Sequence, residues 1–204
     1  MKQEVYNRWV DDHRTVIEEI RLSAHALHAS VNQTYDDDKP YGVHLDMVAQ
    51  SVFDYGYEVC ATECDLLPLF FGAYYHDSIE DARLTYNDVV RQARLWMNEE
   101  QAVVAAEIVY ALTNDKGRTR EQRAGEHYYA GIRQTPYAPF TKLADRLANT
   151  RYSFLHSNQA NRHMQTVYRQ EMAHFLQVIT VDTPDPRFSL PQEMLQAIHS
   201  LLAE

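Results

Sequence analysis

The sequence predicts an all-α protein. Only 6 of the 204 residues are glycine and 7 are proline, whereas the helix formers Ala, Leu, Glu, Gln and Arg are plentiful. Apolar residues recur three and four positions apart along most of the chain. No segment has the clear alternation of apolar and polar residues that predicts a half-buried strand. With 45% hydrophobic residues, a chain of this length can form one domain with a sizeable core.

In the first half of the chain, three segments have the spacing or composition of helices. Residues 4–30 carry apolar side chains at helical spacing. Residues 32–40 are polar and include three consecutive aspartates, which predicts a solvated loop. A second helix is expected from about Val43. Residues 66–79 are strongly apolar and too long for an ordinary strand, so they predict a buried helix that ends near Asp81.

The rest of the chain predicts further helices, each delimited by a capping or breaking signal. Thr85 and Asp88 have the spacing of a capping box, and Asn98 and Gln101 suggest another helix start. Residues 182–186 contain two prolines and mark a clear break. The helices expected in this part cover about 85–96, 98–112, 119 onward, a segment carrying Asp145 that runs to about 156, 161–179 and 191–203.

The net charge of −10 argues against a broad nucleic-acid surface, because phosphate backbones require clustered Lys and Arg. It does not exclude small phosphorylated ligands, because a bound divalent cation reverses the local field. No apolar run approaches the roughly 18 residues that a membrane span needs. The N-terminal residues are too polar for a signal peptide, so we expect a cytoplasmic protein with no membrane partner. The oligomeric state stays open.

Four ionisable residues stand in or directly after the apolar segment 66–79: His76, Asp77, Glu80 and Asp81. In a helix the first two can converge on one ion, and the last two lie one turn further along the same faces. Ionisable groups among core residues are costly unless a cation or a reaction uses them. The pattern therefore favours a metal site.

His44 and Asp145 are the best candidates to complete that site, because each lies on the apolar face of its own predicted helix. Imidazole and carboxylate ligands suit divalent first-row metals, and carboxylates shift the preference toward harder ions such as Mn²⁺. Two histidines and two aspartates would leave coordination positions for water and for a phosphate oxygen.

A site of this composition predicts phosphoryl chemistry, in which a metal acidifies a bound water and polarises a phosphoryl group. Glu80 and Asp81 are close enough in sequence to position or deprotonate that water and to return a proton to the leaving group. Four cationic side chains elsewhere in the chain could offset the remaining phosphate charge: Lys116, Arg118, Lys142 and Arg146.

Four segments, taken in order, resemble the HD-domain metal-dependent phosphohydrolases: KPYGVH at 39–44, YHDSIED at 75–81, ALTNDK at 111–116 and KLADRLANTR at 142–151. More narrowly, they resemble the hydrolase domain of the RelA/SpoT proteins and the small alarmone hydrolases of the Mesh type. An HD pair alone would be weak, but HDxxED together with KLADRxxN is specific. The resemblance implies an HD-domain helical bundle in a single domain over 1–204, with a core at about 20–155 and a helical extension at 157–204.

The resemblance also implies roles for individual residues. One Mn²⁺ would be held by two histidines and two aspartates: His44, His76, Asp77 and Asp145. Two carboxylates, Glu80 and Asp81, would be the catalytic acids that handle the attacking water. Substrate-binding roles would fall to Lys39, Lys116, Lys142, Arg146 and Asn149, with Asn149 contacting the nucleotide. The implied reaction removes the 3′-pyrophosphate from guanosine tetra- or pentaphosphate.

Two alternatives stay open because residues 32–38 are acidic where the family usually carries a basic, glycine-containing run. The first is an HD phosphohydrolase of another nucleotide, such as a deoxynucleotide or a nicotinamide dinucleotide phosphate. The second is a non-catalytic module that senses a nucleotide. Outside the predicted site, His25 and His28 could pair on a helix face, although a structural role is expected for both.

Overall fold

The computed structural model describes residues 1–36, 38–156 and 158–203, and they form an all-α fold with one short hairpin. No helix within those ranges is both long and apolar enough to cross a membrane. The elements are α1 (Gln3–Asp12), α2 (Arg14–Ser30), β1 (Thr34–Tyr35), β2 (Lys39–Pro40), α3 (Gly42–Val59), η1 (Glu63–Asp65), α4 (Leu66–Tyr75), α5 (Tyr86–Ala93), α6 (Glu99–Leu112), α7 (Arg120–Arg123), α8 (Glu126–Gln134), α9 (Ala138–Leu155), α10 (Gln159–Ile179), η2 (Pro186–Phe188) and α11 (Gln192–Ala203).

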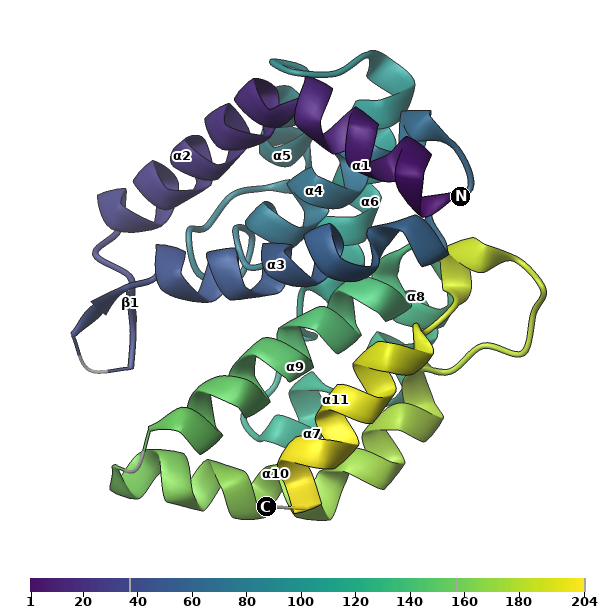
Figure 1. Cartoon of the computed structure of the whole chain (residues 1–204). Helices are drawn as coiled ribbons and strands as arrows, with labels where there is room; N and C mark the ends of the chain where they lie inside the picture. The colour runs from purple at the N-terminus through teal and green to yellow at the C-terminus, as the bar shows by residue number, and fades with distance from the viewer. Residues whose placement is uncertain (37, 157, 204) are drawn as a thin grey trace.

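Helices α3, α4, α6 and α9 form the centre of the molecule (Figure 1). Helix α3 packs against α4 on one side and α9 on the other, and α4 packs against α6. The N-terminal helices α1 and α2 cover α3 and α4, whereas α10 and α11 lie against α9 at the opposite end. The hairpin β1–β2 lies at the start of α3 (Figure 1).

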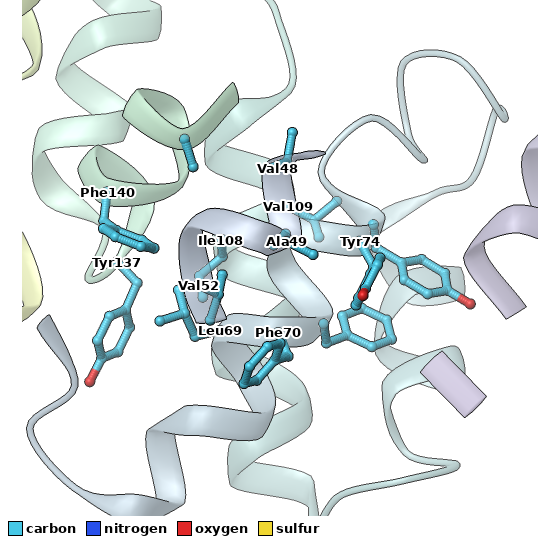
Figure 2. Packing of buried hydrophobic residues seen from close by; sticks show 14 of the residues in the cluster. Val48, Ala49, Val52, Leu69, Phe70, Tyr74, Ile108, Val109, Tyr137 and Phe140 are labelled. Carbon is cyan, nitrogen blue, oxygen red and sulfur yellow. The ribbon is translucent and has the colours of Figure 1, made fainter. Parts of the chain in front are cut away.

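One cluster of buried apolar side chains joins these helices. Figure 2 shows its centre, where Val52 of α3 lies near Leu69 of α4 and Ile108 of α6. The C-terminal helices contribute to the same cluster with five side chains: Met172, Phe175, Ile179, Met194 and Ile198. The segment after residue 157 therefore packs onto the bundle, a point that the sequence left undecided.

Close approach of α4 and α6 depends on a glycine. A Cβ atom added at Gly72 would lie 2.7 Å from Ile108 Cγ2 and 3.2 Å from Ile108 Cβ. Ile108 is fully buried, so it has little room to move away.

The N-terminal segment differs from the sequence-based prediction of one helix over 4–30. The chain breaks at His13 into α1 and α2, because the backbone of His13 leaves the helical region (φ −107°, ψ 12°). Its imidazole stacks on Trp9 at a centroid distance of 3.9 Å, and its Nδ1 lies 2.8 Å from the Trp9 carbonyl oxygen. The expectation that 32–40 is only a loop is also wrong, because β1 and β2 pair antiparallel within it. Asp37 lies outside the described residues.

The apolar helix ends earlier than predicted, at Tyr75 rather than near Asp81. The Ala73 carbonyl, which in a longer helix would accept from the Asp77 amide, lies 2.9 Å from Nδ1 of the His76 imidazole. A series of turns follows, in which the Ser78 amide donates to the Tyr75 carbonyl at 2.8 Å and Arg83 has a positive φ of 61°. The four ionisable residues of this segment therefore do not lie on two faces of one helix.

Most remaining boundaries agree with the prediction to within about three residues, and both expected capping signals form. Thr85 and Asp88 form a capping box at α5, and Asn98 and Gln101 form one at α6. The helix expected from Thr119 is instead two elements, the short α7 and then α8.

Candidate metal centre and active site

Two buried histidines from different elements face each other at the centre of the site. His44 belongs to the first turn of α3, and His76 directly follows α4; they are 2% and 1% exposed. Their Nε2 atoms lie 3.2 Å apart. The packing of α3 on α4 brings together two residues that are 32 positions apart in the sequence.

Two aspartates lie beside the facing imidazoles. Asp77 Oδ2 lies 2.8 Å from His76 Nε2 and 3.6 Å from His44 Nε2. Asp145, on α9, places Oδ1 3.5 Å from His44 Nε2 and 4.0 Å from His76 Nε2. One ligand atom from each of His44, His76 and Asp145 lies within 4.8 Å of the other two. The structure thus brings together all four residues that the sequence nominated as metal ligands.

The hydrogen bonding of His76 fixes which of its ring nitrogens faces the other candidate ligands. Its Nδ1 lies 2.9 Å from the Ala73 carbonyl oxygen, which can only accept a hydrogen bond, so Nδ1 carries the proton. In the neutral ring the lone pair of Nε2 then points at His44 and the carboxylates. An imidazole fixed in this way by a backbone carbonyl is typical of protein metal ligands. The donor set of two imidazoles and two carboxylates therefore fits a divalent first-row cation.

The aspartates stay ionised despite their partial burial. Burial alone would raise the pKa of Asp77, but the charge of His76 and hydrogen bonds from His44 and His76 hold it well below its usual range. Burial would likewise raise the pKa of Asp145, yet the charges of Lys142 and His76 lower it. Lys142 Nζ lies 2.9 Å from Asp145 Oδ2, opposite the oxygen that faces the histidines.

Glu80 and Asp81, the predicted catalytic acids, lie in the turns after α4. Glu80 is exposed, and both of its oxygens accept from the Asn114 side-chain amide, at 3.0 and 2.9 Å. Asp81 is half-buried, and its burial together with the charges of Asp77 and Glu80 raises its pKa to about 6. The two carboxylates therefore have different environments, one fixed by an amide and one partly desolvated.

Sequence reasoning did not single out two tyrosines that contact the proposed ligands. Tyr41 donates a short hydrogen bond to Asp77 Oδ2, and its ring stacks on the buried His28 at 4.7 Å. Tyr35 stacks on His44 at 5.0 Å with an interplanar angle of 19°. Tyr41 stands in the KPYGVH segment, so its place there was an available signal; Tyr35 offered none.

Asn149 is engaged on both sides of its amide group. Its Nδ2 donates to Asp145 Oδ1 at 2.5 Å, and its Oδ1 accepts from the Tyr35 hydroxyl at 2.8 Å. The predicted contact of Asn149 with a nucleotide stays untested, and in this structure its partners are protein groups.

Asp36 of the acidic hairpin forms hydrogen bonds with residues outside the four candidate ligands. Asp36 Oδ2 accepts from the Tyr152 hydroxyl at 2.9 Å, and both of its oxygens lie within 3.4 Å of Asn158 Nδ2. Lys39, one of the predicted substrate-binding residues, has its Nζ 5.5 Å from the Tyr152 ring centroid. It lies beside the site at the hairpin rather than against the proposed ligands.

The other predicted cationic residues take different positions. Lys142 contacts Asp145, as described above, whereas Arg146 points toward α10 and forms an ion pair with Glu171 at 3.4 Å. Its guanidinium also lies 4.3 Å from the Phe175 ring centroid. Lys116 and Arg118 are exposed on the loop between α6 and α7.

A pocket of about 630 Å³ adjoins the site, between α8, α9, α10 and the loop after α6. It meets the candidate active site at two residues, Lys142, which contacts Asp145, and Asn114, which contacts Glu80. Its lining combines cationic side chains, including Arg123, with aromatic ones, including Tyr129.

Comparison with known proteins shows the fold. The sequence matches no family model and no curated protein. Among solved structures, it is similar to one described as "A metazoan ortholog of SpoT hydrolyzes ppGpp and plays a role in starvation responses". The superposition has a TM-score of 0.61 and covers 92% of this chain and 93% of the other, at 17% sequence identity.

The chain has the all-α HD-domain fold. The similarity extends over nearly the whole length of both chains.

Proposed function

We propose that this protein is a metal-dependent phosphohydrolase whose favoured substrate is guanosine 3′,5′-bis(diphosphate), from which it removes the 3′-pyrophosphate. The observation that carries the proposal is the convergence of His44, His76, Asp77 and Asp145, from three separate parts of the bundle, on one point. The similar fold of a metazoan protein described as hydrolysing ppGpp supports the choice of substrate.

The four ligand residues would hold one divalent cation, for which we favour Mn²⁺. Two buried imidazole nitrogens at 3.2 Å, flanked by two carboxylates, need a cation or a proton between them. When bound, the metal would acidify a water molecule and polarise a phosphoryl oxygen.

The protein's own groups would handle the proton and the leaving group. Asp81 would accept the proton of the attacking water and return it to the leaving oxygen, because a carboxyl with a raised pKa can do both near neutral pH. Glu80, fixed by the Asn114 amide, would orient the water. Lys142 stands beside Asp145 at the pocket edge, where it can attract a phosphate of the substrate.

The pocket beside the site supports a nucleotide as the substrate. Its volume of about 630 Å³ lies in the range of pockets that enclose ligands of nucleotide size. The cationic side chains of its lining, among them Lys142 beside Asp145, suit phosphates, and the aromatic side chains suit a base or ribose.

The test is release of phosphate and pyrophosphate by Mn²⁺-loaded protein over a nucleotide panel that includes guanosine tetraphosphate, a deoxynucleoside triphosphate and NADPH. We expect pyrophosphate from the guanosine compound, its loss on chelation, and at least about a hundredfold slower release by the Asp81→Asn variant. Release of orthophosphate from another nucleotide of the panel would support a phosphohydrolase at this site with a different substrate. If the protein binds the metal and releases nothing from any nucleotide, the proposed enzymatic activity is wrong. The alternative of a non-catalytic module that senses a nucleotide would then be favoured.

A further inference from the structure

A hydrogen-bonded relay connects the β1–β2 hairpin to the candidate metal centre. It starts at the Tyr35 hydroxyl, passes through the Asn149 side-chain amide at 2.8 Å, and ends at Asp145 Oδ1 at 2.5 Å. Asp145 Oδ1 is the oxygen that faces the two histidines. Tyr35 and Asn149 are 114 positions apart, so the relay exists only because the hairpin folds back onto α9.

The chemistry of the three groups allows only one orientation of the relay. An ionised carboxylate such as Asp145 can only accept hydrogen bonds, so the NH₂ end of the Asn149 amide must face it. The amide oxygen then faces Tyr35, whose hydroxyl has a proton to donate. Tyr35 therefore fixes the amide of Asn149, and the amide fixes the carboxylate rotamer of Asp145.

Tyr35 also supports a second ligand residue. Its ring stacks on the imidazole of His44, while the Tyr152 ring packs edge-on against Tyr35 at 4.7 Å. His44 Nδ1 is buried and has no hydrogen-bond partner among the described residues, so packing against aromatic rings, Tyr35 stacked and Tyr41 edge-on, restrains the imidazole in place of a hydrogen bond at Nδ1. Tyr35 of the hairpin thus contacts His44 directly and Asp145 through the Asn149 amide.

We propose that Tyr35 is a positioning residue for the metal centre and that Asn149 transmits its effect to Asp145. The inference rests on the proposed function only in assuming that a divalent metal binds these ligands. It assigns Asn149 to the support of a metal ligand rather than to recognition of the nucleotide. It also gives the acidic hairpin a role that does not require contact with a polyphosphate.

The relay predicts how each substitution changes the affinity for Mn²⁺. Calorimetric titration of the 204-residue chain, after chelation and dialysis, measures that affinity. Tyr35→Phe keeps the stacked ring and loses the hydroxyl. It should weaken Mn²⁺ binding about tenfold, the smaller of the affinity losses seen when a group that supports a metal ligand is removed. Asn149→Ala should weaken it at least as much. The double variant should be no weaker than Asn149→Ala alone, because Tyr35 acts through that amide.

Tyr86→Phe is the matched control, since it removes a hydroxyl that donates to the exposed Glu107 and that contacts none of the four candidate ligands. It should leave Mn²⁺ affinity within about twofold. Activity of Tyr35→Phe should return to the wild-type kcat at saturating Mn²⁺, which general unfolding would not allow. Unchanged affinity in Tyr35→Phe, or additive losses in the double variant, would overturn the relay. Failure of the wild-type protein to bind Mn²⁺ would instead overturn the proposed function as well.

Discussion

At the scale of single residues, the candidate site depends on burial as much as on residue type. His44 and His76 are almost completely buried, and each faces carboxylates that would be costly to bury without compensation. Lys142 supplies one positive charge, next to Asp145. A bound cation would supply the rest, so the ligands and the metal should depend on each other.

Removal of one ligand should therefore abolish metal binding. His76→Ala deletes the imidazole whose Nε2 contacts both His44 and Asp77, and we expect Mn²⁺ content to fall from equimolar to background. Elemental analysis of protein loaded with Mn²⁺ and then desalted measures this. The control is His199→Ala, which removes an exposed histidine of α11. Equimolar metal in His76→Ala would show that the ligand assignment is wrong.

The buried His28 predicts a specific loss of stability in acid. Burial lowers its pKa from 6.5 to about 4, whereas the unfolded chain keeps the ordinary value. Between these values the unfolded state binds more protons, so stability is complete above about pH 6.5 and falls as the pH drops toward 4. The loss at pH 4 should reach roughly 3 kcal/mol, the pKa difference multiplied by 1.36 kcal/mol per unit.

The His28→Phe variant isolates the contribution of His28 to the loss of stability in acid. Phenylalanine can keep the stacking on Tyr41 and cannot take up a proton. Urea unfolding of both proteins from pH 7 to pH 4 should show a shallower decline for the variant, by up to that amount. Parallel pH profiles would mean that His28 is hydrated or bonded in the folded protein.

At the scale of elements, close packing of α4 on α6 places His76 at the site, since His76 directly follows α4. The distance between these helices depends on the missing side chain of Gly72, which faces Ile108. Because both residues are buried, a larger residue would separate the helices rather than displace solvent.

Gly72→Ala should therefore destabilise the fold, by about 1–3 kcal/mol, although alanine is the better helix former. Gly131→Ala in α8 is the matched control, because an added Cβ there meets nothing within 4 Å. It should be neutral or stabilise by up to about 1 kcal/mol. Chemical denaturation measures both, and equal effects of the two substitutions would contradict the packing argument.

At the scale of the whole molecule, the C-terminal helices belong to the same apolar cluster as the helices that carry the site. Helices α10 and α11 both pack on α9, which supplies Asp145 and Asn149. Because the buried cluster is shared, a core substitution in α11 should lower the stability of the whole fold.

Ile198→Ala in α11 should lower the free energy of unfolding by about 2–5 kcal/mol, because Ile198 is fully buried. Leu155→Ala, at a side chain that is 77% exposed, should change it by less than about 0.5 kcal/mol. Thermal unfolding followed by circular dichroism should stay a single transition in both. A separate early transition in Ile198→Ala would show that α10 and α11 unfold independently of the bundle.

The sequence by itself determined the all-α class, the capping boxes of α5 and α6, and the four residues that converge as candidate metal ligands. These features are local: helix propensity, hydrogen bonds over three residues, and ionisable groups placed among apolar ones. Only the tertiary structure decided that His44 and His76 face each other, because the packing of α3 on α4 brings together residues 32 positions apart. Likewise, the hydrogen bond from Tyr35 to Asn149 joins segments 114 positions apart, and no periodicity in the chain encodes which polar groups meet across such a distance.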